Sequence, residues 1–512
     1  MPDDPALQLL DQPSAEQTPA TSEQASEIDG PGSRPRGRGR PSALVAWLLV
    51  AVAGLGMFIS TPPSAGPDEP THEVTAWYLS GHGLRPGSIE WFSVPVSFSV
   101  DPCFIHASQV TAGCMPPRST AQALASTAEF TNYGPPYYWV VGVGQRIAAS
   151  LLGIEYADIG GRLASFILNF GALLVLSLYM RRRSQWWGTF LLLVSTPMAV
   201  FMGIVVNPNG WEITCGLVMG AVLSEAVWSR QSLGSDAWPR ATTAMLVVAS
   251  IALSLARPLG FIWASGLTVS AIALAPSVNR RLLLRVASAV APGIVLGILW
   301  TLAFPTLLPS DVAANPTTVG NVADAFGLSL LLFPFRVWQM FGDLGWLDTP
   351  PPVPLFLATI AAWGVLLTRL PSIGKAAKLC GVFGIVILPS AIESTGLGIW
   401  WQGRYTLPFA LGFGLLLLLR SGQLIPRTVS IVSGIAVLSL GVMVWVNAVR
   451  YDFGLSIFDL PASLEHQGLS PVRVLLSAAI GALLLLAGGY LLFQAWRMER
   501  DLRSAAARSR TG

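Results

Sequence analysis

The chain has 512 residues, of which 52% are hydrophobic and only 12% are charged. In an ordinary soluble domain roughly a quarter of the residues are charged. This composition therefore excludes an ordinary soluble domain and indicates a chain that crosses a membrane several times. The net charge of +3 gives no strongly basic field, and we expect no nucleic acid partner.

Residues 1–41 are polar, rich in Pro, Ser and Glu, and carry four arginines between Arg34 and Arg40. This composition predicts a disordered cytoplasmic tail with a basic end. The apolar stretch that follows has no small-residue cleavage site, and we expect it to remain as a membrane anchor. Residues 496–512 are predicted to form a second, basic cytoplasmic tail.

Apolar stretches recur along residues 42–495 and predict an all-α polytopic membrane domain with about twelve transmembrane helices. The predicted spans lie near residues 42–61, 160–180, 187–206, 210–228, 241–256, 259–277, 286–305, 353–369, 378–394, 406–420, 428–447 and 473–495. With the N-terminus in the cytoplasm, all but nine of the 31 Lys and Arg residues fall on the inner side. The positive-inside rule therefore places both termini in the cytoplasm.

The longest predicted loop covers residues 62–159 and is extracytoplasmic in this orientation. Long loops tend to carry function. Its last part, from Pro135 to Leu152, is apolar but contains Gln145 and Arg146, which favours an interfacial helix over a thirteenth span. A second large extracytoplasmic segment covers residues 306–352.

Two adjacent carboxylates, Asp68 and Glu69, lie near the start of the first outer loop, between Pro67 and Pro70. Proline fixes the backbone on either side, so the two acids sit on a stiff turn. They are candidates for the acidic centre of a membrane enzyme. The alternative is an acidic N-cap for an interfacial helix that begins at Thr71.

Cys103 and Cys114 lie in the same outer loop, on the oxidising side, and are predicted to form a disulfide that holds the loop. Cys215 and Cys380 fall inside apolar spans and are predicted to pack there. No Cys or His cluster has zinc-ligand spacing, so neither a metal site nor a cofactor is predicted. Assistance by a divalent cation near the acids stays open.

Three outer arginines are candidates to bind an anionic substrate. Arg257 and Arg404 each lie where a span meets the outer surface beside a structure-breaking residue, and Arg162 lies at the start of the second span. Guanidinium groups recognise phosphate oxygens, and a nearby carboxylate can take a proton from an attacking hydroxyl. The alternative is that these arginines reach lipid head groups or anchor helix ends. His72 could bind substrate, or a metal together with the acids.

Several motifs resemble those of the GT-C superfamily of membrane glycosyltransferases, and within it the bacterial domain of unknown function 2142 family. They are Pro67-Asp68-Glu69-Pro70-Thr71-His72, Tyr133-Gly134-Pro135-Pro136-Tyr137-Tyr138, Gly160-Gly161-Arg162-Leu163, Gly345-Trp346-Leu347-Asp348-Thr349-Pro350, and Gln402-Gly403-Arg404-Tyr405 with Pro408. The resemblance covers roughly residues 42 to 450. It adds Tyr137, Asp348, Gln402 and Tyr405 to the candidate substrate-binding residues.

The resemblance implies a multi-pass protein of the bacterial plasma membrane that catalyses on its outer face. It implies a polyprenyl-phosphate sugar donor, a cell-envelope glycan or glycolipid acceptor, inversion at the anomeric carbon, and Asp68 or Glu69 as the base, with Asp68 favoured. Many superfamily members have a histidine where this chain has Gly134, so the role of that histidine does not carry over. Two alternatives stay open: a transporter or flippase of a lipid-linked saccharide, and a polymerase or ligase of lipid-linked oligosaccharides.

Overall fold

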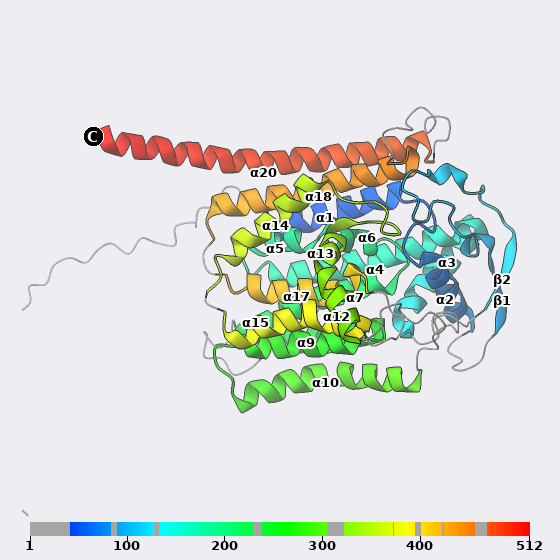
Figure 1. Ribbon diagram of the computed structural model, residues 1–512, viewed down its shortest axis with the longest axis horizontal. Coiled ribbons are helices and arrows are strands. Elements are labelled where there is room, and N and C mark those ends of the chain that lie inside the picture. The colour runs from blue at the N-terminus through cyan, green and yellow to red at the C-terminus, as the bar shows by residue number, and fades with distance from the viewer. Residues whose placement is uncertain are drawn as a thin grey trace, which may run out of the picture. The chain divides into compact units, whose positions relative to one another are not determined.

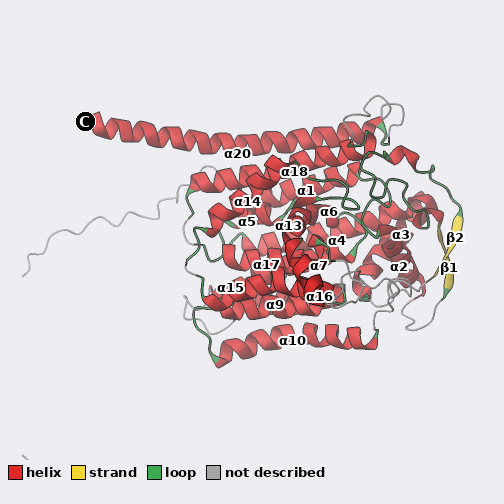
Figure 2. Cartoon of the chain, viewed as in Figure 1, coloured by secondary structure: helices red, strands yellow, loops and turns green. Residues whose placement is uncertain are grey.

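The computed structural model describes residues 41–82, 90–126, 133–228, 238–304, 322–371, 373–394, 401–421, 424–455 and 468–511. All but the last residue of the predicted tail 1–41 lie outside this set, as do residues 306–321 of the second predicted outer segment. The described chain is mostly helical and has one small two-stranded sheet (Figure 2).

Seven helical segments of the described chain are long and apolar enough to cross a membrane. They are α1 (Ala43–Ser60), the 3-10 turn η3 (Ile154–Tyr156) with α4 (Ala157–Met180), α7 (Pro208–Trp228), α10 (Arg280–Ala303), the run of α15 (Lys375–Val382), η4 (Phe383–Ile387) and α16 (Leu388–Ser394), α18 (Pro426–Asp452) and α20 (Pro471–Thr511). An eighth span results if α12 (Val322–Leu331) and α13 (Phe333–Gly342), which are bent by 51°, count as one. The protein is therefore a polytopic helical membrane protein.

The predicted number of about twelve spans is not confirmed. Four predicted spans correspond to shorter apolar helices: α8 (Arg240–Ala256), α9 (Gly260–Ala273), α14 (Val353–Leu367) and η5 (Gly403–Thr406) with α17 (Leu407–Leu418). The span predicted near residues 187–206 is instead two helices, α5 (Trp187–Val194) and α6 (Pro197–Met202). Pro197 has no N–H to continue α5, and the Thr196 side chain accepts from the Ala199 N–H to start α6.

The first predicted outer loop contains both helices and strands. Helix α2 (Glu69–His82) and helix α3 (Pro135–Leu152) pack against each other, and α3 also packs on α4. Between them, β1 (Trp91–Pro95) pairs antiparallel with β2 (Gln122–Ser126). The domain was predicted to be all-α, and this small sheet is an exception to that prediction. Two short 3-10 turns, η1 (Val96–Phe98) and η2 (Ala112–Cys114), complete the segment. The placement of α2 and α3 at the membrane surface stays a prediction.

Glycines set the packing that brings the polar residues together. Helix α7 packs along α17 (Figure 1), and a Cβ at Gly216 or Gly220 would collide with the backbone of Pro408 or Gly412. Small residues let two helix backbones approach closely in a membrane protein. The first turn of α7 and the turn η5 before α17 are thereby held close, and polar side chains gather where these two helices begin.

Candidate functional site

Asp68 lies at the turn that starts α2. Its φ of 57° is in the left-handed region, which an Asp adopts more readily than most residues. Its carbonyl accepts from the His72 N–H at 3.2 Å, as expected for a residue that begins a helix. Its side chain is 45% exposed and pairs with Arg404, Oδ2 to Nη2, at 3.0 Å. Asp68 is therefore an accessible carboxylate on a constrained turn.

Arg404 is the buried partner of Asp68. Its side chain is only 1% exposed, although it belongs to the short turn η5. Its Nη2 atom donates to Asp68 and to the Tyr405 hydroxyl at 3.2 Å. Its Nε and Nη1 atoms are buried and have no acceptor among the described residues. A buried guanidinium with unused donors suits an anion, because phosphate and carboxylate oxygens accept several N–H groups at once.

Arg257 lies beside this pair because α8 ends in front of Pro258, and a residue before proline is extended. Its guanidinium lies 4.3 Å from the centre of the Tyr405 ring and 5.8 Å from that of Tyr133. Its Nη1 atom is 3.8 Å from Glu212 Oε2. Two arginines from distant parts of the chain thus meet at one tyrosine.

Three residues at the start of α7 complete the arrangement. Asn209 Nδ2 donates to Glu212 Oε2 at 3.1 Å, and the Asn209 N–H donates to Asn207 Oδ1 at 2.9 Å. Asn207 Nδ2 in turn donates to the Pro67 carbonyl at 2.8 Å.

Eight residues therefore form a closed series of contacts, which we name the contact ring. Its members in order are Pro67, Asp68, Arg404, Tyr405, Arg257, Glu212, Asn209 and Asn207. The sequence predictions included Asp68, Arg257, Arg404 and Tyr405 but missed Asn207, Asn209 and Glu212 as site residues. A carboxylate inside a predicted span is unusual enough to have marked Glu212.

An aromatic cluster flanks the contact ring. His72 Nδ1 lies 2.8 Å from the Tyr138 hydroxyl, and the His72 ring meets the Tyr133 ring edge-on at 5.7 Å. Burial, followed by the positive charges of Arg257 and Arg404, holds the pKa of His72 well below its usual value. The imidazole is thus neutral at physiological pH. Burial likewise raises the pKa of Tyr133 and of Tyr138, which keeps both phenols protonated.

Glu69, the neighbour of Asp68, lies in a different environment. It is fully buried and accepts from Arg162 Nε at 2.7 Å and from Arg162 Nη2 at 2.5 Å. It also accepts the N–H groups of Gly66 and Val206, at 2.8 and 2.9 Å. Arg162 further donates to the carbonyls of Thr61 and Pro62, at 2.8 and 2.7 Å. We name Glu69, Arg162 and these partners the Glu69 network; it ties the end of α1 to α4.

One further acid, Glu73, and one tyrosine, Tyr137, lie near this network. The Tyr137 hydroxyl is 3.1 Å from Ser165 Oγ, and burial raises its pKa. Glu73 is buried, and neither of its carboxylate oxygens has a donor among the described residues. Burial, reinforced by the charges of Glu69 and Asp158, raises the pKa of Glu73 well above its usual value. The surroundings of Glu73 thus favour its neutral, protonated form.

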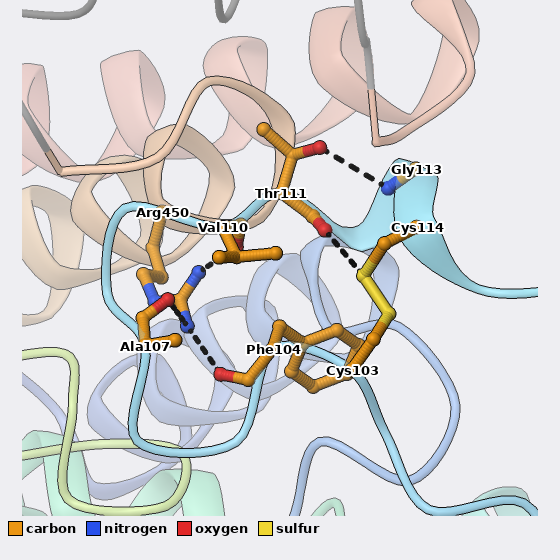
Figure 3. Close-up of a disulfide and its surroundings, with 8 residues drawn as sticks. All are labelled: Cys103, Phe104, Ala107, Val110, Thr111, Gly113, Cys114 and Arg450. Atoms are coloured by element: carbon orange, nitrogen blue, oxygen red, sulfur yellow. Dashed lines mark hydrogen bonds between the residues drawn. A yellow bond between two sulfur atoms is a disulfide. The ribbon is translucent and has the colours of Figure 1, made fainter.

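Asp348 is placed apart from the contact ring, in a clamp with Arg450. Arg450 Nη2 donates to Asp348 Oδ2 at 2.9 Å and to the carbonyls of Phe104 and Ala107, each at 3.0 Å. Arg450 Nη1 donates to the Val110 carbonyl at 2.6 Å. These three carbonyls belong to the loop that the Cys103–Cys114 disulfide closes, with a Cα–Cα distance of 6.1 Å (Figure 3). The predicted disulfide is thus present in the structure. Asp348 helps to hold the loop that the disulfide closes, because it pairs with Arg450, which binds the loop carbonyls.

The remaining candidate, Gln402, lies next to the contact ring. Its carbonyl accepts from the Tyr405 N–H at 3.0 Å, and its Oε1 is buried without a donor among the described residues. Within the described part of the chain, no group of three or more His, Cys, Asp or Glu residues could hold a metal ion. The structure thus brings Asp68, Arg257, Arg404 and Tyr405 together with His72 and Gln402 beside them. It places Glu69, Arg162, Tyr137 and Asp348 in neighbouring buried contacts.

The fold and these contacts define a polytopic helical membrane protein with a carboxylate and two arginines in one polar site. The model of a family described as predicted membrane proteins (DUF2142) matches residues 51–413. The chain therefore belongs to this family. None of the curated proteins compared with the chain matches it. The matched range includes every member of the contact ring.

Proposed function

We propose that the protein is an inverting membrane glycosyltransferase. It would transfer a sugar from a polyprenyl-phosphate donor to a cell-envelope glycan or glycolipid on the extracytoplasmic face of a bacterial membrane. In this proposal Asp68 is the base, and Arg404 and Arg257 hold the donor phosphate.

One observation carries the proposal: the accessible carboxylate of Asp68 faces a buried arginine that has donors to spare. Arg404 Nε and Nη1 have no acceptor among the described residues. An unsatisfied buried donor of a charged group costs more than 1 kcal/mol, so an incoming phosphate would gain two strong hydrogen bonds and relieve this cost. Arg257, held against Tyr405, supplies a second positive charge near the same place.

The proposed reaction balances with these groups alone. The oxygen of an acceptor hydroxyl attacks the anomeric carbon of the donor, and Asp68 takes the hydroxyl proton. The bond between the anomeric carbon and the phosphate oxygen breaks, and its electron pair leaves with the lipid phosphate. That phosphate departs as an anion, which the two arginines stabilise. Attack opposite the leaving group inverts the anomeric carbon.

An apolar cavity supports the lipid part of the proposed donor. The cavity has a volume of about 400 Å³ and is lined mainly by residues of α13, α14 and α17. One of its lining residues is Leu407, three positions after Arg404. Its lining runs along α17 to Leu417, which spans about 15 Å of helix. A prenyl chain bound by its phosphate at Arg404 has this apolar surface within reach.

A second candidate function is transport of a lipid-linked saccharide, and one observation favours it. Helices α12 and α13 are bent by 51° at a short break, the geometry of a broken span or a re-entrant loop, and broken spans are common around transporter binding sites. The contact ring would then bind a head group without cleaving it.

The experiment uses the purified full chain in lipid nanodiscs with a panel of radiolabelled polyprenyl-phosphate pentoses and hexoses. Envelope glycans and glycolipids serve as acceptors, with and without a chelator. Wild-type protein is expected to transfer one sugar, and the Asp68→Asn variant to lose transfer while it still binds the donor. Undiminished transfer by Asp68→Asn would overturn the assignment of the base. Movement of the intact labelled donor across the bilayer of a vesicle, without transfer, would support the transporter instead.

A further inference from the structure

Asn209 has an acceptor atom that the mechanism above does not use. The residue is fully buried in the first turn of α7. Its side-chain oxygen, Oδ1, has no hydrogen-bond donor among the described residues. A buried amide oxygen without a donor is costly, so such an atom calls for an explanation.

Its neighbours fix the orientation of this amide. Asn209 Nδ2 donates to Glu212 Oε2 at 3.1 Å. If the amide were turned over, its oxygen would face Glu212 Oε2, and with the ionised carboxylate two acceptors would meet with no proton between them. The backbone N–H of Asn209 is also held, by Asn207 Oδ1 at 2.9 Å. Glu212 therefore directs the amide oxygen away from itself and leaves it available to accept.

Asn209 is also a member of the contact ring, where it links the proposed base to the proposed phosphate-binding arginine Arg257. Through Asn207 it connects to Pro67, the residue before the proposed base. Through Glu212 it connects to Arg257. The groups proposed to contact phosphate, on Arg404, are donors, whereas the unused atom of Asn209 is an acceptor. The ring thus offers donors for an anion and an acceptor for a group that carries a proton.

We propose that Asn209 Oδ1 accepts a hydrogen bond from one hydroxyl of the transferred sugar and thereby selects the sugar. This inference rests on the proposed function, because it assigns a sugar-recognition role to the same ring. Glu212 is a positioning residue for this contact, since it holds the Asn209 amide. A sugar that lacks the hydroxyl leaves Oδ1 buried and unpaired, and sites that bond a substrate hydroxyl reject such analogues strongly.

The test measures kcat/KM for the sugar that wild-type protein transfers and for each of its monodeoxy analogues, all as polyprenyl phosphates. Wild-type protein is expected to discriminate against one analogue by about 100-fold or more. Asn209→Ala is expected to reduce that ratio to below about 5-fold, mainly by slowing transfer of the hydroxylated sugar. Ratios at the other hydroxyl positions should stay unchanged, which a general loss of folding would not produce.

Two further variants separate recognition from structure. The double variant Asn209→Asp with Glu212→Gln exchanges the acid and the amide. The new amide at position 212 donates to one carboxylate oxygen at position 209, and the other oxygen accepts from the sugar hydroxyl. Discrimination between the sugar and its analogue should therefore return. Asn169→Ala is the matched control, because Asn169 is also a fully buried asparagine but its Oδ1 already accepts from Thr214 at 2.8 Å. It is expected to keep the wild-type ratio at every position.

Each outcome decides the inference. If Asn209→Ala keeps the wild-type ratio for every analogue, or if wild-type protein accepts every analogue equally well, Asn209 does not select the sugar and the proposed function still stands. If wild-type protein transfers no sugar from any donor in the panel, the proposed function fails, and this inference fails with it.

Discussion

Asp68 and Glu69 are adjacent acids, each paired with an arginine, yet they lie in opposite environments. The Glu69 network is closed: the carboxylate accepts four hydrogen bonds and is fully buried. The Asp68–Arg404 pair of the contact ring is open: Asp68 is 45% exposed, and Arg404 keeps two buried nitrogens without acceptors among the described residues. A closed pair stabilises a fold, whereas an open pair has capacity left for a ligand. The comparison therefore assigns structure to Glu69 and chemistry to Asp68.

The largest expected effect is on activity, at Asp68. Asp68→Asn should lower kcat/KM for sugar transfer by about 10³-fold, because it removes the base from a general-base step. The thermal unfolding midpoint should change by only a few degrees, since the side chain is half exposed and makes one ion pair. Transfer assays and thermal unfolding of the same purified sample check both parts. A large drop in the midpoint would show that this acid, too, is structural.

The converse result is expected at Glu69. Glu69→Gln leaves the buried Arg162 guanidinium without a counter-charge, and breaking a buried pair in this way costs about 3 to 5 kcal/mol. We expect a large fall in the unfolding midpoint and in the yield of folded protein. The fraction that folds should still transfer sugar at a rate within about tenfold of wild type. A stable variant with no activity would instead place Glu69 in the reaction.

A smaller stability effect is expected at the disulfide. Joint replacement of Cys103 and Cys114 by Ser opens a loop with a sequence separation of 11, which should cost roughly 2 to 3 kcal/mol of stability. Without the disulfide, the loop is held by the hydrogen bonds from Arg450 to its three carbonyls. Unfolding midpoints of oxidised, reduced and double-Ser protein measure the effect. Equal midpoints for all three would show that the Arg450 clamp alone holds the loop.

The smallest expected effect is a pH dependence outside the contact ring. Burial, followed by the charge of Asp348, raises the pKa of Asp343 to about 7. Between the pKa of about 4 in the unfolded state and this value, Asp343 is protonated in the folded state but ionised in the unfolded state. The free energy of unfolding is therefore highest near pH 4 and falls as the pH rises toward 7. Over pH 5 to 8 the loss should be at most about 2.6 kcal/mol. Asp343→Asn should flatten this part of the profile of midpoint against pH.

The amino-acid sequence by itself determined the class of the protein and several local features. Low charge and recurring apolar stretches predicted a multi-pass helical membrane protein, because a bilayer requires long uncharged helices. The prolines around Asp68 and Glu69 predicted a stiff acidic turn, and two cysteines in one loop predicted the disulfide. The orientation of the termini and the sugar chemistry stay predictions.

Only the tertiary structure decided which acid is available. Asp68 and Glu69 are adjacent, but their arginines lie 336 and 93 positions away in the chain. Exposure and pairing depend on such distant partners, so no local pattern distinguishes the two acids. The same reason explains why Asn207, Asn209 and Glu212 were missed as site residues: close packing of α7 on α17 through glycines brings them to the arginines. The number of full spans also depended on breaks such as the one at Thr196 and Pro197.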